Sequence, residues 1–305
     1  MGRVNEPELI EKLRARVGLH RTAGLVLGIG DDCAIVRPRG ALEDWLYTTD
    51  MLIEGTHFLR HTHSAADAGW KALARGLSDI AAMGGEPRFC LLSLAVADWV
   101  DARWLDRFQG GLLLLAEQSG TALIGGDLAR TQRVMCDIVV AGTVPRGRAL
   151  RRDGARAGDA IYVSGALGGS ALGLASGRGQ AWTRHKRPQP RLKLGRFLRT
   201  RLAATAAMDL SDGLSLDLHR LCAASGLRAE IAPPPVHRGA TLAQALHGGE
   251  DYELLFTTPP RVRVPAAFEG LPLTRIGTMR RGTAGTVDLN GQPLPPLGFD
   301  HLRRQ

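Results

Sequence analysis

Apolar residues at three- and four-residue spacing predict amphipathic helices over residues 4 to 17 and 65 to 83. The second helix has the clearer stripe, formed by Trp70, Leu73, Leu77 and Ile80. Two glycines, Gly84 and Gly85, follow this stripe and predict the end of the helix. The pattern therefore begins with a short helix and continues to a longer one.

Short apolar runs predict strands on both sides of the longer helix. Their ranges are 34–37, 45–49, 89–96, 122–124 and 135–144, with a further helix at 101–119. The pattern places Thr48, Thr49 and Asp50 in a turn after the second strand, and Gly125-Gly126-Asp127 in a turn after the fourth. These elements predict a mixed N-terminal domain of helices and strands.

The second half of the chain starts after a connector rich in Gly, Arg and Asp at residues 146 to 158. A strand at 160–164 and a glycine-rich turn at 165–169 follow, and helices and strands then alternate. A length of 305 residues suits two domains better than one. We expect an α+β fold of two mixed α/β domains, residues 1–150 and 151–305, with the boundary near Leu150.

Composition indicates an ordinary soluble protein, with 44% apolar and 23% charged residues. The chain has no apolar run near the roughly 18 residues of a membrane span, and no signal-peptide pattern at its start. Its cysteines are scattered without a CxxC pair, which favours reduced thiols. We therefore expect a cytoplasmic protein without a membrane partner.

Arginine supplies most of the formal net charge of +9. The planar guanidinium group suits phosphate recognition, although a general bias toward Ala, Gly and Arg explains the excess equally well. A basic segment at residues 178–201 leaves a nucleic-acid-binding protein as an alternative. Only Trp182 and Phe197 offer aromatic stacking near it, so we expect no nucleic-acid partner.

Aspartates dominate the candidate chemistry, since the chain lacks a GxxxxGK[ST] loop and the HRD and DFG motifs of protein kinases. They are Asp31, Asp32, Asp50, Asp79, Asp127, Asp209 and Asp212. Dispersed carboxylates that converge with substrate phosphates are typical of a magnesium site. No zinc spacing is present. The sequence thus predicts a magnesium-dependent reaction of a phosphorylated substrate.

Each aspartate also has an ordinary explanation. Asp212 is placed to cap the helix that follows it. Asp79 stands one turn after Arg75, which is the spacing of a surface ion pair on a helix. These alternatives remain open from the residues alone.

Several motifs together resemble the thiamine-monophosphate kinase family. They are GIGDDCA at 28–34, TTDML at 48–52, GTHF at 55–58, KAL at 71–73, LSDIAAMG at 77–84, GGD at 125–127, DLSDGL at 209–214 and GGEDYEL at 248–254. Their joint order across nearly the whole chain is far more specific than any single motif. One departure is Leu128-Ala129, where the family usually has threonines before an arginine.

The resemblance implies a fold shared with aminoimidazole ribonucleotide synthetase, in which two N-terminal domains pair into a barrel-like sheet of a homodimer and the C-terminal domain is an α/β sandwich. The implied magnesium ligands are Asp32, Thr48, Thr49, Asp50, Asp79, Asp127, Asp209 and Asp212. The implied ATP contacts are Gly126, Asp127, Arg152 and Ser211. The implied contacts to thiamine monophosphate are His57, Glu250 and Phe299.

The expected reaction is in-line transfer of the terminal phosphoryl group of ATP to thiamine monophosphate, which gives thiamine diphosphate. The acceptor's own phosphate oxygen is the nucleophile, so no catalytic base and no covalent residue is expected. Glu250 and Phe299 also have ordinary explanations: Glu250 stands just before a strand predicted at 252–257, and Phe299 lies close to the chain end, where it could pin the tail to the core. A selenophosphate synthetase is disfavoured, because no cysteine precedes Cys33.

Overall fold

The computed structural model describes residues 6–17 and 22–299. Its N-terminal half contains a six-stranded sheet with the strand order β1-β2-β3-β6-β4-β5. The strands are β1 (Leu25–Leu27), β2 (Ala34–Val36), β3 (Glu43–Ile53), β4 (Glu86–Val96), β5 (Ala122–Arg130) and β6 (Met135–Pro145). All neighbours are antiparallel except β4 and β5. The described part of the chain therefore has the mixed α/β character that the sequence predicts.

Two expected turns are wrong, because Asp50 and Asp127 both lie inside strands. Asp50 pairs with Ile138 across β3 and β6, and Asp127 pairs with Ser93 across β5 and β4. Glycines ordinarily interrupt a strand, which is why the pattern ended the strand before Gly125. Here Gly126 is required inside the strand, since a Cβ on it would lie 1.8 Å from the carbonyl oxygen of Leu92.

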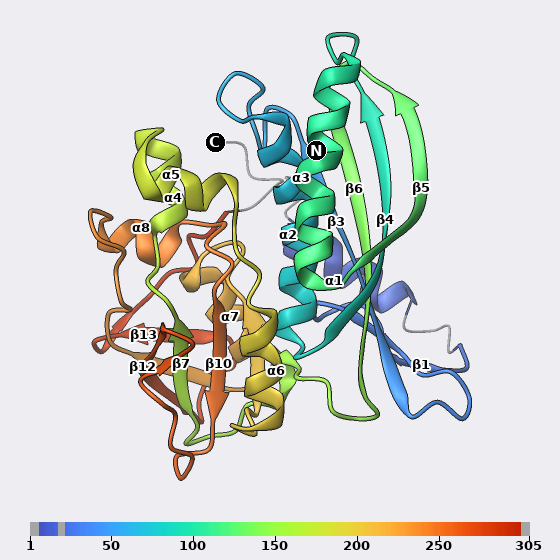
Figure 1. Cartoon of the computed structure of the whole chain (residues 1–305). Helices are drawn as coiled ribbons and strands as arrows, with labels where there is room; N and C mark the ends of the chain where they lie inside the picture. The colour runs from blue at the N-terminus through green and yellow to red at the C-terminus, as the bar shows by residue number, and fades with distance from the viewer. Residues whose placement is uncertain (1–5, 18–21, 300–305) are drawn as a thin grey trace.

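Two long helices cover one face of this sheet: α2 (Ala65–Ala82) and α3 (Ala102–Ser119) (Figure 1). Ser64 and Asp67 form a capping box at the start of α2, and the Asp101 side chain accepts a hydrogen bond from the Trp104 amide at the start of α3. The helices approach each other at Gly69, where a Cβ would lie 1.9 Å from the carbonyl oxygen of Phe108.

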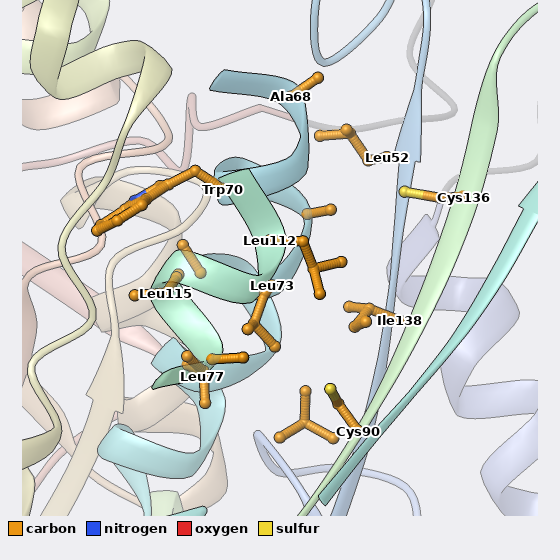
Figure 2. Close-up of a cluster of buried hydrophobic side chains, with 14 of the residues drawn as sticks. Leu52, Ala68, Trp70, Leu73, Leu77, Cys90, Leu112, Leu115, Cys136 and Ile138 are labelled. Atoms are coloured by element: carbon orange, nitrogen blue, oxygen red, sulfur yellow. The ribbon is translucent and has the colours of Figure 1, made fainter. Parts of the chain in front are cut away.

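The core between these helices and the sheet is built from the apolar stripe of α2. Figure 2 shows Leu73 and Leu77 facing Ile138 and Cys90 of the strands, with Leu112 of α3 beside them. All five side chains are buried. The predicted helix at residues 65 to 83 is confirmed by this packing. Burying such side chains stabilises the fold by roughly 1.5–3 kcal/mol each.

The predicted first helix is α1 (Glu6–Val17), and its residues 4 and 5 lie outside the described part of the chain. Its apolar residues do not pack in this structure. Leu9, Leu13 and Val17 are all exposed.

The C-terminal half contains an eight-stranded sheet with the order β14-β13-β9-β12-β7-β10-β8, and β11 pairs with β12. The strands are β7 (Ala160–Ser164), β8 (Ala206–Asp209), β9 (Arg228–Ile231), β10 (Leu254–Thr258), β11 (Ala267–Phe268), β12 (Leu271–Arg280), β13 (Thr286–Leu289) and β14 (Gln292–Pro293). The helices are η1 (Arg152–Gly154), α4 (Gly169–Ser176), α5 (Gly179–Lys186), α6 (Leu192–Thr200), α7 (Leu214–Ala224) and α8 (Leu242–His247). The strand expected at 252–257 begins two residues later, so Glu250 precedes it in a loop.

The two halves meet along α2, which contacts α6, β8 and α5 (Figure 1). The indole of Trp70 donates a 2.8 Å hydrogen bond to the carbonyl oxygen of Pro188. The Asp67 carboxylate binds both Lys186 and Arg187. One helix therefore belongs to the core of the first half and to the contact with the second. Among the described residues, no helix is long and apolar enough to cross a membrane.

Candidate functional site

Three aspartates that are far apart in the sequence meet where the two halves join. Asp32 lies in the loop before β2, Asp79 lies on α2, and Asp209 is the last residue of β8. One carboxylate oxygen from each lies within 4.8 Å of the others. Such a set of hard oxygen donors suits a divalent cation that prefers carboxylate ligands. The sequence predicted that these three residues would converge, and the structure brings them together.

Burial and mutual repulsion make this cluster electrostatically costly. The pKa of Asp79 is raised well above its usual value by burial and then by the charges of Asp209, Asp32 and Asp50. The pKa of Asp209 is likewise raised well above its usual value by burial and by Asp32. Like charges this close disfavour ionisation of one another, and a bound cation removes that penalty. The donor set therefore fits a metal ion.

Hydroxyl groups of the N-terminal half orient carboxylates of the cluster from both halves. Thr48 Oγ1 donates to Asp79 Oδ2 at 2.5 Å, and Ser78 Oγ donates to Asp209 Oδ2 at 2.6 Å. Thr48 lies on the helix-covered side of the first sheet, and Ser78 lies on α2 itself. The carboxylates are thus fixed before any ligand binds.

Arg75 pairs with Asp50 and not with Asp79, so the alternative of a surface ion pair along the helix is excluded. The guanidinium Nε and Nη2 donate to the two oxygens of Asp50, at 2.9 and 2.5 Å. Asp50 reaches α2 because even-numbered residues of β3, such as Leu46 and Leu52, face the core. The spacing of residues along one helix does not reveal which strand residues pack against that helix.

The loop between β8 and α7 presents Ser211 and Asp212 to the site. The alternative that Asp212 caps the helix is excluded, because Gly213 occupies the N-cap position without a side-chain hydrogen bond. Asp217 instead accepts hydrogen bonds from the backbone amides of Asp212 and Gly213, at 3.1 and 3.0 Å. The Asp212 carboxylate binds Arg220 at 2.5 Å and stays at the surface of the loop.

A cavity of about 490 Å³ begins at the aspartate cluster and extends along the second half. Its lining includes the predicted site residues Asp50, Asp79, Asp209, Ser211, Asp212, Glu250 and Phe299. The cavity is thus lined by several carboxylates and an aromatic ring, contributed by both halves of the chain.

The three residues predicted to contact the acceptor come from three separate segments. Glu250 lies in the loop before β10, and its backbone amide donates to the carbonyl oxygen of Ser211 at 2.7 Å. The amide of Phe299 donates to the carbonyl oxygen of Asp212 at 2.9 Å, which holds this late residue at the cavity. His57 is buried behind the wall, where its Nδ1 accepts from the Ile53 amide at 3.0 Å, and its neighbour Thr56 lines the cavity.

Arg152 lies beside the first acidic pair. Its guanidinium binds Asp32 through Nη2, and its backbone amide donates to Asp31 Oδ2 at 3.0 Å. Burial, followed by the charge of Asp32, raises the pKa of Asp31 to about 7. Arg152 is thus held within reach of the aspartate cluster, with Asp32 as its ionic partner.

Thr49, Gly126 and Asp127 are not brought to the cavity within this chain. Thr49 Oγ1 donates to Asp137 Oδ1 at 2.6 Å on the face of the sheet that α2 does not cover. Asp127 shares that open face, because it pairs with Ser93, which in turn pairs with Asp137. Leu128, where the family pattern has a threonine, is 78% exposed on the same strand.

Sequence reasoning missed five residues that line the cavity: Arg75, Ser170, His185, His247 and Tyr252. Tyr252 stands inside the quoted GGEDYEL motif, so its position beside Glu250 was available as a signal. Ser170 directly follows the glycine-rich turn at 165–169, and His185 lies in the basic segment at 178–201, and neither was assigned to the site. Their approach to the cavity depends on tertiary contacts that no local pattern encodes.

Two family models match the chain: "AIR synthase related protein, N-terminal domain" over residues 30–144 and "AIR synthase related protein, C-terminal domain" over residues 156–290. The fold and site thus define an AIR synthase related protein. Thiamine-monophosphate kinase of Escherichia coli (strain K12) is 40% identical over 304 residues, covering 90% of this chain and 92% of that protein. The corresponding kinase of Bacillus subtilis (strain 168) is 33% identical, covering 98% and 100%. The chain belongs to the thiamine-monophosphate kinase family and is an enzyme.

Solved structures support the same assignment. The structure of AaThiL complexed with AMPPCP and TMP has a TM-score of 0.86 and 31% identity, and covers 99% of both chains. Thiamine-monophosphate kinase from Stenotrophomonas maltophilia K279a has a TM-score of 0.76 and 38% identity, covering 93% of this chain and 96% of that one. The hydrogenase maturation protein HypE in complex with ATP, at 19% identity and a TM-score of 0.69, shares the fold alone.

Proposed function

We propose that this enzyme transfers the terminal phosphoryl group of ATP to thiamine monophosphate and releases thiamine diphosphate and ADP. The observation that carries the proposal is the single cavity that joins the aspartate cluster to Glu250 and Phe299. The relatives named above support it, since AaThiL was solved with AMPPCP and TMP. An acidic group and an aromatic ring suit the cationic thiazolium and the aminopyrimidine of the acceptor.

We further propose that magnesium ions bind at Asp32, Asp79 and Asp209, with Thr48, Asp50 and Asp212 nearby. When bound, they offset the repulsion between the donor and acceptor phosphates. Thr49 and Asp127 remain predicted ligands. Within a single chain, both lie on the open face of the sheet and away from the cavity.

The proposed ATP contacts are Arg152, Ser211, Gly126 and Asp127. Arg152 is placed by its bonds to Asp31 and Asp32 to meet an anionic phosphate beside the cluster. The acceptor phosphate oxygen attacks in line, and its second pKa of about 6 leaves it largely ionised at neutral pH. Accordingly no residue here is assigned as a base. The acceptor contacts are His57, Glu250 and Phe299.

We also propose a homodimer formed through the open face of the N-terminal sheet, which closes the two sheets into a barrel. Tyr47, Met51, Phe89 and Leu91 lie on that face and are each 38–45% exposed. Contiguous exposed apolar residues of this kind mark an interaction surface. The division into domains at residues 1–150 and 151–305 belongs to this proposal, with the second domain completing the cleft.

Two alternatives are disfavoured by contacts in the structure. Four charges of the basic segment are occupied internally: Arg184 and Arg191 bind Glu253, and Lys186 and Arg187 bind Asp67. These charges are therefore not displayed for nucleic acid. For a selenophosphate synthetase, Cys33 is unsuited as a nucleophile, since burial raises its thiol pKa well above the usual value.

A cytoplasmic location forms part of the proposal. Cys33, Cys90, Cys136 and Cys222 are all buried free thiols, as expected for a reducing compartment.

The proposed function is tested by an ATP-consumption assay in which thiamine monophosphate, thiamine and selenide compete as acceptors. ADP formed with thiamine monophosphate, together with thiamine diphosphate identified by chromatography, is the expected result. Consumption of ATP with selenide alone would move the enzyme to the alternative activity of the same superfamily.

A further inference from the structure

The side chain of Lys71 is completely inaccessible to solvent, although it carries an ammonium group. It lies in the first half of α2, on the side that meets the C-terminal half. Its Nζ donates to the backbone oxygen of His57 and to Glu250 Oε2, both at 2.9 Å. A buried ammonium is costly unless it is paired and hydrogen-bonded, so these two acceptors are what keep Lys71 in place.

The two acceptors of Lys71 come from opposite sides of the cavity. The His57 carbonyl belongs to the loop that leads into α2, and Glu250 belongs to the loop before β10 in the other half. Lys71 therefore connects the two segments that the proposed function places against the acceptor. It does so from behind the wall, without contacting the cavity itself.

Glu250 has one oxygen engaged and one oxygen available. Its Oε2 binds Lys71 and lies 3.4 Å from His185 Nδ1, whereas Oε1 is buried without a hydrogen-bond donor among the described residues. The backbone around it is strained, with φ of 64° at Glu250 and 50° at Tyr252. Non-glycine residues keep such angles only where their surroundings hold them.

We propose that Lys71 is a positioning residue for the acceptor, which fixes the Glu250 side chain in the part of the cavity wall that meets the aminopyrimidine. This inference rests on the proposed function and extends it. Lys71 acts only through Glu250 and the His57 segment, because no atom of its side chain is open to a ligand.

The charge state of Glu250 fits this role. Burial by itself raises the pKa of Glu250, but the charge of Lys71, followed by His185 and Arg75, brings it down to about 2. Burial lowers the pKa of His185 to about 3, so its ring is neutral at physiological pH. Tyr252 and His63 also face Glu250. Burial raises the pKa of Tyr252 and lowers the pKa of His63, so both side chains are neutral at physiological pH. Lys71 is thus the leading cation that keeps Glu250 ionised as an acceptor.

The test is steady-state kinetics of Lys71→Met, Glu250→Gln and the double variant, with saturating ATP and magnesium and with thiamine monophosphate varied. Lys71→Met is expected to raise the KM for thiamine monophosphate at least tenfold and to leave the KM for ATP within about twofold. In this variant the KM for the acceptor is also expected to rise as the pH falls through the raised pKa of Glu250. The parent enzyme is expected to show only the dependence that titration of the acceptor phosphate itself produces, which the variants share.

The double variant separates positioning from a merely structural role. On the Glu250→Gln background, Lys71→Met is expected to change the KM for the acceptor less than threefold, since the residue through which it acts is already altered. The matched control is Lys186→Met, which breaks another ion pair between α2 and the C-terminal half but lies outside the cavity lining. Its acceptor KM is expected to match the parent.

Three outcomes overturn the inference. They are an unchanged acceptor KM in Lys71→Met, an equal tenfold rise on the Glu250→Gln background, and an equal rise in Lys186→Met. If Lys71→Met does not fold, the double variant is compared with Glu250→Gln instead, because the double variant buries no unpaired carboxylate. Absence of any turnover of thiamine monophosphate by the parent enzyme is a different result: it removes the proposed function and the inference with it.

Discussion

Ser78 on α2 donates a 2.6 Å hydrogen bond to Asp209 at the end of β8, so a carboxylate from one half of the chain is oriented by a hydroxyl group from the other. Both side chains are almost fully buried. The aspartate cluster is therefore a property of the contact between the halves and not of either half alone.

Ser78→Ala is expected to lower the free energy of unfolding by about 1–3 kcal/mol, because Asp209 loses a donor while it stays buried. The magnesium concentration for half-maximal activity is expected to rise several-fold. Urea unfolding and a magnesium titration of activity measure the two effects. Ser119→Ala, which removes a hydroxyl at the end of α3 away from the cavity, is the control. An unaltered magnesium requirement in Ser78→Ala would contradict this prediction.

Asp50→Asn is expected to lower turnover by at least about tenfold and to leave the fold intact, because a metal ligand is lost from the cavity. Asp44→Asn is a matched control on the same strand. Asp44 also binds an arginine, Arg37, through both oxygens, but lies outside the cavity. The control should lose stability and keep its turnover. Activity of Asp50→Asn within about twofold of the parent at saturating magnesium would show that Asp50 serves only as the partner of Arg75.

Phe299→Ala is expected to raise the KM for thiamine monophosphate several-fold and to leave the KM for ATP nearly unchanged, since only the acceptor end of the cavity loses an aromatic face. Phe268→Ala is the control: Phe268 stacks on Phe197 with ring centroids 4.5 Å apart and lies outside the cavity lining. Equal increases for both substrates, or a lowered melting temperature with normal kinetics, would identify Phe299 as a packing residue.

Light scattering is expected to give the mass of a dimer at micromolar concentration. Leu91→Glu, on the open face of the sheet, is expected to shift this mass toward the monomer, because a charge on each copy is brought into the apolar contact. Leu113→Glu, on the exposed side of α3, is expected to leave the dimer intact. A monomer mass for the parent chain would remove the proposed shared barrel.

Asp67 provides a test of stability against pH. Burial alone raises its pKa, but hydrogen bonds from Lys186, Arg187 and Ser64 bring it down to about 2, against the ordinary value of 3.8 in the unfolded chain. A depressed carboxyl pKa stabilises the fold above the unfolded value and loses that contribution as the pH falls toward the folded value. Asp67→Asn should thus cost about 2 kcal/mol at pH 7.

The difference between Asp67→Asn and its parent is expected to shrink between about pH 4 and pH 2, as the parent carboxylate becomes protonated. Urea midpoints measured at several pH values check this dependence. A difference that is constant over that range would show that the hydrogen bonds of Asp67, and not its charge, account for its effect.

The sequence predicted the longer helix and the convergence of Asp32, Asp79 and Asp209, because a helical stripe is local and the motif order is specific to the family. It could not predict which carboxylate Arg75 binds, since that choice depends on a strand whose alternate residues face α2. It also placed Asp127 in a turn, because a glycine pair usually ends a strand. Here Gly126 lies inside the strand, because β4 approaches it too closely for any side chain.

Lys71 was visible in the sequence only as part of a motif, with no indication of its partner. Its bond to Glu250 joins residues 179 positions apart and requires both halves to be folded. Contacts of this kind are set by packing, which residue spacing does not encode.

The double role of α2 limits how the enzyme can move. Trp70, Lys71 and Ser78 on this helix each bind the C-terminal half, while Leu73 and Leu77 on the same helix are locked into the N-terminal core. If the halves separated, the buried ammonium group of Lys71 would lose Glu250, and the buried carboxylate of Asp209 would lose Ser78. Opening the cavity by moving the two halves apart is therefore disfavoured, because it breaks all three of these contacts at once.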